Sequence, residues 1–244
     1  MIPARSPVAF RRWWIAIGSL GAFTALAVTV HFGLLNTFDS IIRDWARPGD
    51  VWGTVQLRAD YVVEGLRPIV IGTLLAAFTV VLCLIRRSWR PIVFVGGVCL
   101  ASVLVTVVAK FAVGRPDTHG ATDNLGGSFP SGHTVSIIVC LGLAVLVVKP
   151  RVGRWIWLIP GLTAILMGTS LVVQAAHWST DVVGGGLLAV SVLAATTGTG
   201  WHQWSRGSRR HQSEGSMSGL SAASSASLAV QVDPEGAAGS PVAG

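Results

Sequence analysis

Charged residues are scarce in this sequence of 244 residues. Asp, Glu, Lys and Arg make up 12% of it, whereas 51% is hydrophobic. A soluble domain carries about 25% charged residues, so this shortage excludes an ordinary soluble fold and indicates a membrane protein. Cysteine is scarce as well: Cys83, Cys99 and Cys140 all lie inside apolar runs. They are typical of small buried side chains, and they exclude a disulfide framework and a zinc-binding spacing.

The net charge of +7 is not gathered into one stretch of the chain. The basic residues form short groups between apolar runs, as in the loops of membrane proteins, so nucleic acid is not expected as a partner. The sequence also lacks a cluster of carboxylates, or of Cys and His, with the spacing of metal ligands. No metal or other cofactor is therefore expected. The oligomeric state is left open.

Six apolar runs are long enough to cross a bilayer, which requires about 20 residues per helix. They predict an all-α fold: a polytopic membrane protein with six transmembrane helices in a bundle. The first run follows basic residues and contains Ala-Leu-Ala at 25–27, which leaves a cleaved signal peptide as an alternative. Its apolar character continues to Leu35 and favours an uncleaved span. The predicted spans are 13–35, 67–85, 91–109, 132–148, 155–175 and 182–200.

The distribution of Lys and Arg predicts the orientation, because cytoplasmic loops carry an excess of these residues. With both termini in the cytoplasm, twelve Lys and Arg lie inside and six outside. The predicted parts are a cytoplasmic N-terminus at 1–12, a membrane domain at 13–204 and a disordered cytoplasmic tail at 205–244, which is rich in Ser, Gly and Ala. The expected location is the plasma membrane.

The first outer loop, 36–66, is long. Phe38, Ile41 and Trp45 recur in it at helical spacing, with charged residues between them. This pattern predicts an amphipathic helix at the membrane interface. The favoured interpretation is that this helix seals the bundle surface; the alternative is that it borders a lateral entrance for lipid.

Residues 129–134 (F-P-S-G-H-T) stand at the start of the fourth apolar run. Ser131 before such a run is a helix-start signal, and Pro130 is tolerated in a first helical turn. The N–H groups and positive dipole of a helix start favour phosphate, and Gly132 lets an anion approach the backbone. His133 is then placed to act as a general acid on a leaving-group oxygen. An ordinary helix cap followed by an interfacial His is the alternative.

His177 and Asp181 stand four residues apart, which puts both on one face of a helix. An Asp beside a His fixes its tautomer and stabilises the imidazolium. An unpaired carboxylate at the start of an apolar span is costly, so a functional pair is favoured over one that only ties two helix ends together. Lys110 and Arg115 lie in the second outer segment, on the same side of the membrane, where two cations form a phosphate clamp or serve as interfacial anchors.

These motifs resemble those of the type 2 phosphatidic acid phosphatase superfamily, whose membrane members have six helices. The family patterns are K-x6-R-P, P-S-G-H and S-R-x5-H-x3-D. The second is complete at 130–133, the third matches at Ser170, His177 and Asp181, and the first matches at Lys110. The order of the motifs and their shared membrane side agree as well, so the resemblance covers about residues 10–200.

The resemblance implies a metal-independent phosphatase of lipid phosphates that works through a phosphohistidine. It implies that His177 attacks phosphorus, that Asp181 orients His177, and that His133 protonates the leaving group and later activates water. The phosphate ligands that it implies are Lys110, Arg115, Ser131 and Gly132.

Two positions depart from the family patterns. The residue seven positions after Lys110 is Asp117, where the family has Arg, and Leu171 replaces the Arg of the third motif. Arg115 stands two residues before Asp117, where family members often carry an additional Arg. The absence of each charge-assisted contact to phosphate costs about 1.5–3 kcal/mol, so altered activity is expected.

A site at interface depth suits a phosphate head group whose tail remains in the bilayer, with membrane lipids as the surroundings. A polyprenyl diphosphate or monophosphate is the favoured substrate, followed by phosphatidic acid and phosphatidylglycerol phosphate. The missing arginines motivate an alternative, a non-catalytic lipid-phosphate binder or transporter. A lipid phosphotransferase on the same scaffold is the other alternative. The intact His133, His177 and Asp181 favour an enzyme over a binder.

Overall fold

The structure, a computed structural model, describes residues 7–122, 126–148, 154–199 and 201. Over these residues the chain forms eight α-helices and two short 3-10 helices, and no strand occurs among them. The all-α prediction is confirmed. The helices are α1 (Pro7–His31), α2 (Asn36–Ala46), η1 (Pro48–Asp50), α3 (Thr54–Gly65), α4 (Pro68–Arg86), α5 (Arg90–Val113), α6 (Gly132–Val148), η2 (Arg154–Trp157), α7 (Leu158–Val173) and α8 (Ser179–Gly198).

Each of the six predicted spans corresponds to one helix, namely α1, α4, α5, α6, α7 and α8. Five helical stretches are long and apolar enough to cross a membrane, and α6 is a shorter apolar helix of 17 residues. The chain is therefore a multi-pass membrane protein. The tail at 205–244, which was predicted to be disordered, lies outside the described residues.

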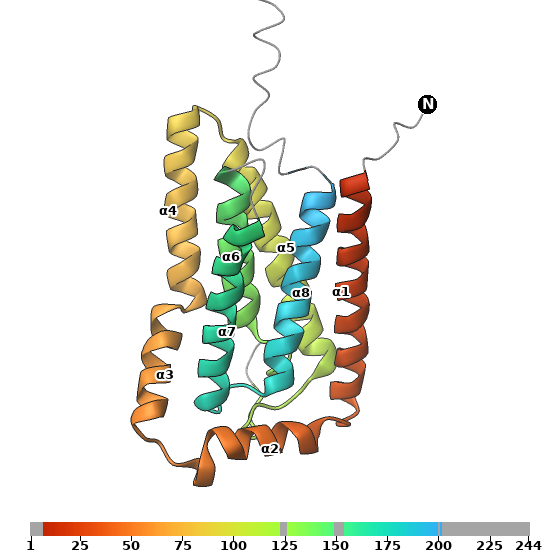
Figure 1. The fold of residues 1–244 in the computed structure, drawn as a ribbon, viewed down its shortest axis with the longest axis vertical. Helices are drawn as coiled ribbons and strands as arrows, with labels where there is room; N and C mark the ends of the chain where they lie inside the picture. Colours follow the sequence, from red (N-terminus) through yellow and green to blue (C-terminus); the bar gives the residue numbers. More distant parts are fainter. Residues whose placement is uncertain (1–6, 123–125, 149–153, 200, 202–244) are drawn as a thin grey trace, which may run out of the picture. The chain divides into compact units, whose positions relative to one another are not determined.

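Helix α6 lies in the middle of the bundle, where it packs against α4, α5, α7 and α8 (Figure 1). Its sequence is apolar on every side, as expected of a helix surrounded by others. Side chains of α6, α7 and α8 meet in a core from which water is excluded. The largest fully buried ones there are Ile137, Leu143, Met167, Leu171 and Leu188.

Helix α1 packs along α8 for much of its length (Figure 1). Ser191 on α8 donates a hydrogen bond of 3.0 Å to the carbonyl of Ala16 on α1. Phe23 stacks on Phe129, with ring centroids 5.7 Å apart. Because Phe129 directly precedes the start of α6, this contact links α1 to the segment that contains His133.

Two helices fill the long outer loop, and one of them, α2, lies across an end of the bundle (Figure 1). A helix occurs where the amphipathic pattern predicted one, and its place at a membrane interface stays a prediction. Its apolar residues Phe38, Ile41 and Trp45 are 53%, 63% and 84% exposed, whereas Asp39 is 1% exposed. Asp39 therefore faces the bundle, and these apolar side chains face away from it.

Candidate active site

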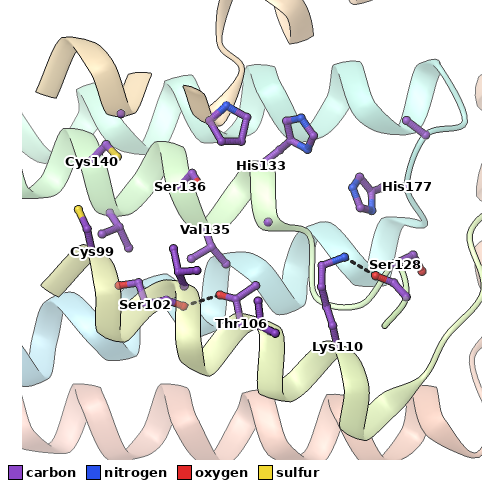
Figure 2. Close-up of a pocket in the computed structure, with 18 of the residues that line it drawn as sticks. Cys99, Ser102, Thr106, Lys110, Ser128, His133, Val135, Ser136, Cys140 and His177 are labelled. Atoms are coloured by element: carbon purple, nitrogen blue, oxygen red, sulfur yellow. Dashed lines mark hydrogen bonds between the residues drawn. The ribbon is translucent and has the colours of Figure 1, made fainter. Parts of the chain in front are cut away.

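A cavity of about 530 Å³ lies between α4, α5 and α6. Figure 2 shows Lys110, His133 and His177 at one end of it, and Cys99 and Cys140 at the other. The first end lies where α5 finishes and α6 begins, beside the α7–α8 turn. The other end reaches into the middle of the bundle along α5 and α6. One polar end and one largely apolar end give the cavity an amphipathic lining.

The two histidines of the sequence motifs meet at the polar end. His133 lies in the first turn of α6 and His177 in the turn before α8. Their ring centroids are 6.0 Å apart, with an interplanar angle of 68°. One phosphate group in the cavity would therefore be close enough to contact both imidazoles. His119, in contrast, is an exposed loop residue outside the cavity lining.

His177 is oriented by Asp181. Its Nδ1 lies 3.4 Å from Asp181 Oδ2, and the same oxygen accepts the Trp178 N–H at 3.1 Å. Asp181 is the third residue of α8, so its charge lies near the positive end of the helix dipole. The His–Asp distance is long for a hydrogen bond, as is common at empty catalytic sites. With Nδ1 engaged, Nε2 is the ring nitrogen that remains for a ligand in the cavity.

The turn that carries His177 is fixed from several directions. Ala175 adopts a left-handed conformation (φ 55°), which reverses the chain between α7 and α8. Thr118 donates to the Ala175 carbonyl, and Arg47 donates 2.8 Å to the neighbouring carbonyl of Gln174. These contacts come from the loop after α5 and from the end of α2, so the position of His177 depends on both.

The start of α6 contributes backbone groups. Gly132 lines the cavity, and a Cβ added there would meet no atom within 4 Å, so its backbone is open to a ligand. Ser131 is fully buried, and its Oγ lies 3.5 Å from the Thr134 nitrogen, as in a helix cap. The Ser131 N–H donates to the Asp181 carbonyl at 3.0 Å. Ser131 therefore joins α6 to α8, while Gly132 faces the cavity.

Lys110 lines the polar end from the last turns of α5. It is 7% exposed, and its Nζ donates to the carbonyl of Gly127. Gly127 has a φ of 132° and lies so near the Arg115 carbonyl that a Cβ would come within 2.5 Å of it. Only glycine fits this close approach. The loop after α5 thus folds back to hold the ammonium group at the cavity wall.

Arg115 occupies a different place from the one expected of a phosphate ligand. It does not line the cavity, and its guanidinium lies between two buried carboxylates. Nη2 donates to Asp39 at 2.6 Å and Nη1 to Asp181 at 2.9 Å. Nη1 also donates to the Thr180 hydroxyl at 2.7 Å, and the group lies over the Trp178 ring at 5.0 Å. The charge of Arg115 is therefore directed at the acids behind His177.

Asp39 is the residue of this site that sequence reasoning missed. The signal was present, since Asp39 stands on the polar face of the predicted helix, but a polar face is normally expected to meet water. Burial on its own would raise the pKa of Asp39, but hydrogen bonds from Ser179, Thr180 and Arg115 outweigh it and hold that pKa below its ordinary value of 3.8. Asp39 is thus a buried, ionised acid.

The two departures from the family patterns fall in different surroundings. Asp117 lines the cavity, and its Oδ1 accepts the N–H groups of His119 and Ala121 at 2.9 and 2.8 Å. Leu171 packs in the hydrophobic core and is fully buried. Asp117 therefore brings an acid to the polar end of the cavity, whereas Leu171 does not line the cavity. Within the described ranges, no group of three or more His, Cys, Asp and Glu side chains is arranged to hold a metal ion.

Comparison with known proteins agrees with this arrangement. The sequence profile of the PAP2 superfamily matches residues 90–205, which include Lys110, His133, His177 and Asp181. This part of the chain is therefore similar to the PAP2 superfamily. The crystal structure of a transmembrane PAP2-type phosphatidylglycerolphosphate phosphatase from Bacillus subtilis has a similar fold, with a TM-score of 0.65 and 19% sequence identity. The alignment covers 77% of this chain and 96% of that one. No curated protein sequence matches the chain significantly. Asp39 lies outside the PAP2 match.

Proposed function

We propose that this protein is a membrane lipid phosphatase that hydrolyses a phosphate or diphosphate monoester through a phosphohistidine at His177, without a metal ion. The observation that carries the proposal is the polar end of the cavity. There His133, His177, Lys110 and the start of α6 surround one space that continues into an apolar interior. A binder of lipid phosphate needs the cation and the helix start, but it does not need an Asp-oriented imidazole opposite a second imidazole.

Binding of the phosphate would use the helix start and Lys110. The backbone at Gly132 offers N–H groups in the region of positive dipole, which favours an anion. The ammonium of Lys110 adds a positive charge from the opposite wall. Ser131 supports the helix start as its cap, and Arg115 acts from behind the nucleophile. These two residues are therefore proposed as supports of the phosphate site and not as its direct ligands.

The reaction would proceed in two steps. In the first, His177 Nε2 forms a bond to phosphorus while the bond from phosphorus to the leaving oxygen breaks, and His133 gives its proton to that oxygen. The leaving oxygen belongs to the lipid alcohol in a monophosphate and to the lipid monophosphate in a diphosphate. In the second, water attacks phosphorus, His133 takes the proton of the water, and the P–N bond breaks to release inorganic phosphate. Asp181 stabilises the positive charge that develops on His177.

The lipid nature of the substrate is inferred from the rest of the cavity. Its volume of about 530 Å³ falls in the range of about 300–1,000 Å³ usual for ligand sites. Polyprenyl diphosphates and monophosphates, phosphatidic acid and phosphatidylglycerol phosphate all combine such a head group with an apolar tail. The excess of Lys and Arg at the other end of the helices supports a plasma-membrane protein with both termini in the cytoplasm and an extracytoplasmic site.

The proposal is tested by phosphate release from those four lipid classes, using the full chain in detergent, with and without EDTA. The variants are His177→Ala and, as a matched control, His119→Ala, which removes an exposed histidine outside the cavity. We expect release that survives EDTA, disappears in His177→Ala and persists in His119→Ala. Acid-labile, base-stable labelling of the protein by ³²P-labelled lipid would identify the phosphohistidine.

Two outcomes would contradict the proposal. Tight binding of a lipid phosphate with no release would favour the binder or transporter alternative. Transfer of the phosphate to an added lipid alcohol, in preference to water, would favour the phosphotransferase.

A further inference from the structure

We propose that Asp39, on helix α2, is a positioning residue for the nucleophile, and that it acts on His177 through Arg115 and Asp181. This inference rests on the proposed phosphatase function. It adds to the site a residue outside the segment that matches the PAP2 superfamily.

The carboxylate of Asp39 is buried and surrounded by polar groups. Both of its carboxylate oxygens are engaged by groups of other segments. Oδ1 accepts the Ser179 hydroxyl at 2.5 Å and the Thr180 N–H at 3.1 Å. Oδ2 accepts the Thr180 hydroxyl at 2.5 Å and Arg115 at 2.6 Å. Asp39 is also the one buried residue of α2. A carboxylate buried with a full set of partners indicates a specific role at that place.

Asp39 caps the start of α8. Ser179 and Thr180 are the first two residues of this helix, and the preceding Trp178 has no side-chain oxygen to cap it. Asp39 therefore supplies, from a distant segment, the oxygen that an N-cap residue normally supplies. Its negative charge also lies at the positive end of the α8 dipole. Since Asp181 is the next residue, fixing this first turn fixes the carboxylate that orients His177.

Asp39 also sets the balance of charge around Arg115 and Asp181. Arg115 contacts Asp39 and Asp181 at 2.6 and 2.9 Å, so one positive charge lies between two negative ones. The three side chains together carry a net charge of −1. Without Asp39, Arg115 would neutralise Asp181, and the cluster would no longer favour a positive imidazole ring. Asp39 thus lets Asp181 be held by Arg115 and still stabilise the charge that develops on His177.

Other charged groups pair with His177 or line the same cavity, and none of them is substituted in the variants described below. They are His133 on α6, Lys110 on α5, Asp117 in the loop after α5 and Asp181 on α8.

The experiment compares Asp39→Asn with Asp44→Asn in the full chain, by phosphate release over a range of substrate concentration and pH. Asp44 is a matched control, because it lies on the same helix, is 66% exposed and, in the described part of the chain, pairs with the neighbouring Arg43. We expect Asp39→Asn to lower kcat about tenfold to a hundredfold, the range for one lost contact to a charged group. KM should stay near its wild-type value, and Asp44→Asn should match the wild type.

The pH profile separates positioning from a general loss of structure. His177 must be neutral to attack, and the loss of a negative charge behind it makes the imidazolium less stable. The acid limb of the kcat profile should therefore move to lower pH in Asp39→Asn. Asp39→Glu, which keeps the charge, should restore the wild-type limb and part of kcat. A merely structural role would lower the active fraction and leave the limb where it is.

Should Asp39→Asn fail to fold, Arg115→Lys gives a second test. A single ammonium does not reproduce the forked contacts of the guanidinium to two carboxylates, so kcat should fall with KM unchanged. An active wild type with variants equal to it, or with a rise in KM alone, would overturn the positioning role while the proposed function stands. A wild type that releases phosphate from no lipid would overturn the proposed function, and the positioning role with it.

Discussion

His177 has two sides that differ in how their polar groups find partners. On the anchored side (Asp39, Arg115, Thr180 and Asp181), every side chain is at most 7% exposed, and the four hydrogen-bond to one another. The cavity side (Lys110, Asp117, Gly132 and His133) instead borders empty space.

The difference moves Arg115 from the group that the resemblance assigned to phosphate to the group that surrounds Asp181. Arg115 was expected to hold phosphate, but it lies with the acids of the anchored side. In the proposed function, phosphate is therefore held mainly by the helix start at Gly132 and by Lys110. We propose that the anchored side sets the position and charge of His177 and that the cavity side receives the ligand.

The largest expected effect comes from neutralising the acid shared by the anchored side and His177. Asp181→Asn should lower kcat by about 10³–10⁴-fold, because an amide neither holds the required tautomer nor stabilises an imidazolium. Phosphate release from the best lipid substrate measures the effect, with thermal unfolding in detergent as a check of folding. Activity near that of the wild type in a folded variant would contradict the assignment of Asp181.

Alanine substitutions at three glycines distinguish the backbone that borders the cavity from the helix packing behind it. Gly132→Ala would add a methyl group to open space in the cavity, so activity should fall about tenfold to a hundredfold with little change in melting temperature, since small displacements of a reacting group have effects of this size. In Gly185→Ala the new Cβ would lie 2.7 Å from the Ser131 carbonyl oxygen. Such overpacking costs about 1–3 kcal/mol of folding stability.

Gly186→Ala is the control for both variants, because a Cβ there meets nothing within 4 Å and Gly186 does not line the cavity. It should leave activity and melting temperature unchanged. Full activity in Gly132→Ala would show that the phosphate does not approach the start of α6.

A smaller effect is expected at the acid of the cavity side. Asp117→Asn keeps an Oδ1 that accepts the N–H groups of His119 and Ala121, but it removes a negative charge that faces the phosphate. Activity should rise about threefold to tenfold, as expected for one charge at partly solvated range. The rise should be larger for a diphosphate than for a monophosphate and smaller at high salt. A fall in activity would indicate that Asp117 assists binding or catalysis.

The smallest effect concerns stability in acid. Because the pKa of Asp39 is lowered in the folded protein, its contribution to stability is present above its ordinary pKa of 3.8 and is lost as the pH falls through the lowered value. The difference in melting temperature between the wild type and Asp39→Asn should therefore be constant near neutral pH and shrink below about pH 4. A difference that persists unchanged in acid would mean that Asp39 acts through shape alone.

The bundle was predictable because apolar length is a strong signal. All six runs became helices, with ends displaced by a few residues where turns such as 32–35 interrupt the apolar run. The grouping of Lys110, His133 and His177 also followed from the sequence, because each stands at the same end of an apolar run. Their detailed roles stay predictions.

The anchored side was not predictable in the same way. The sequence places Arg115 at the same end of the apolar runs as Lys110 and His177, but the direction of its guanidinium depends on the loop that folds back through Gly127. For Asp39 the usual inference fails for a physical reason. A helix at the membrane surface turns its apolar side chains toward lipid, so its polar face can meet the protein as well as water.

The contact between Asp39 and the start of α8 also orders events during biosynthesis. Asp39 precedes Ser179 by 140 residues, so the ribosome completes five of the six predicted spans before Ser179 and Thr180, which donate to this acid together with Arg115, are made. Until then the carboxylate needs water, which a surface helix provides and a transmembrane helix would not. Insertion of α8 places His177, Asp181 and the helix start that Asp39 caps. A nascent chain that ends before Ser179 therefore lacks Asp181 and the start of α8, and the proposed site would be complete only once α8 is made.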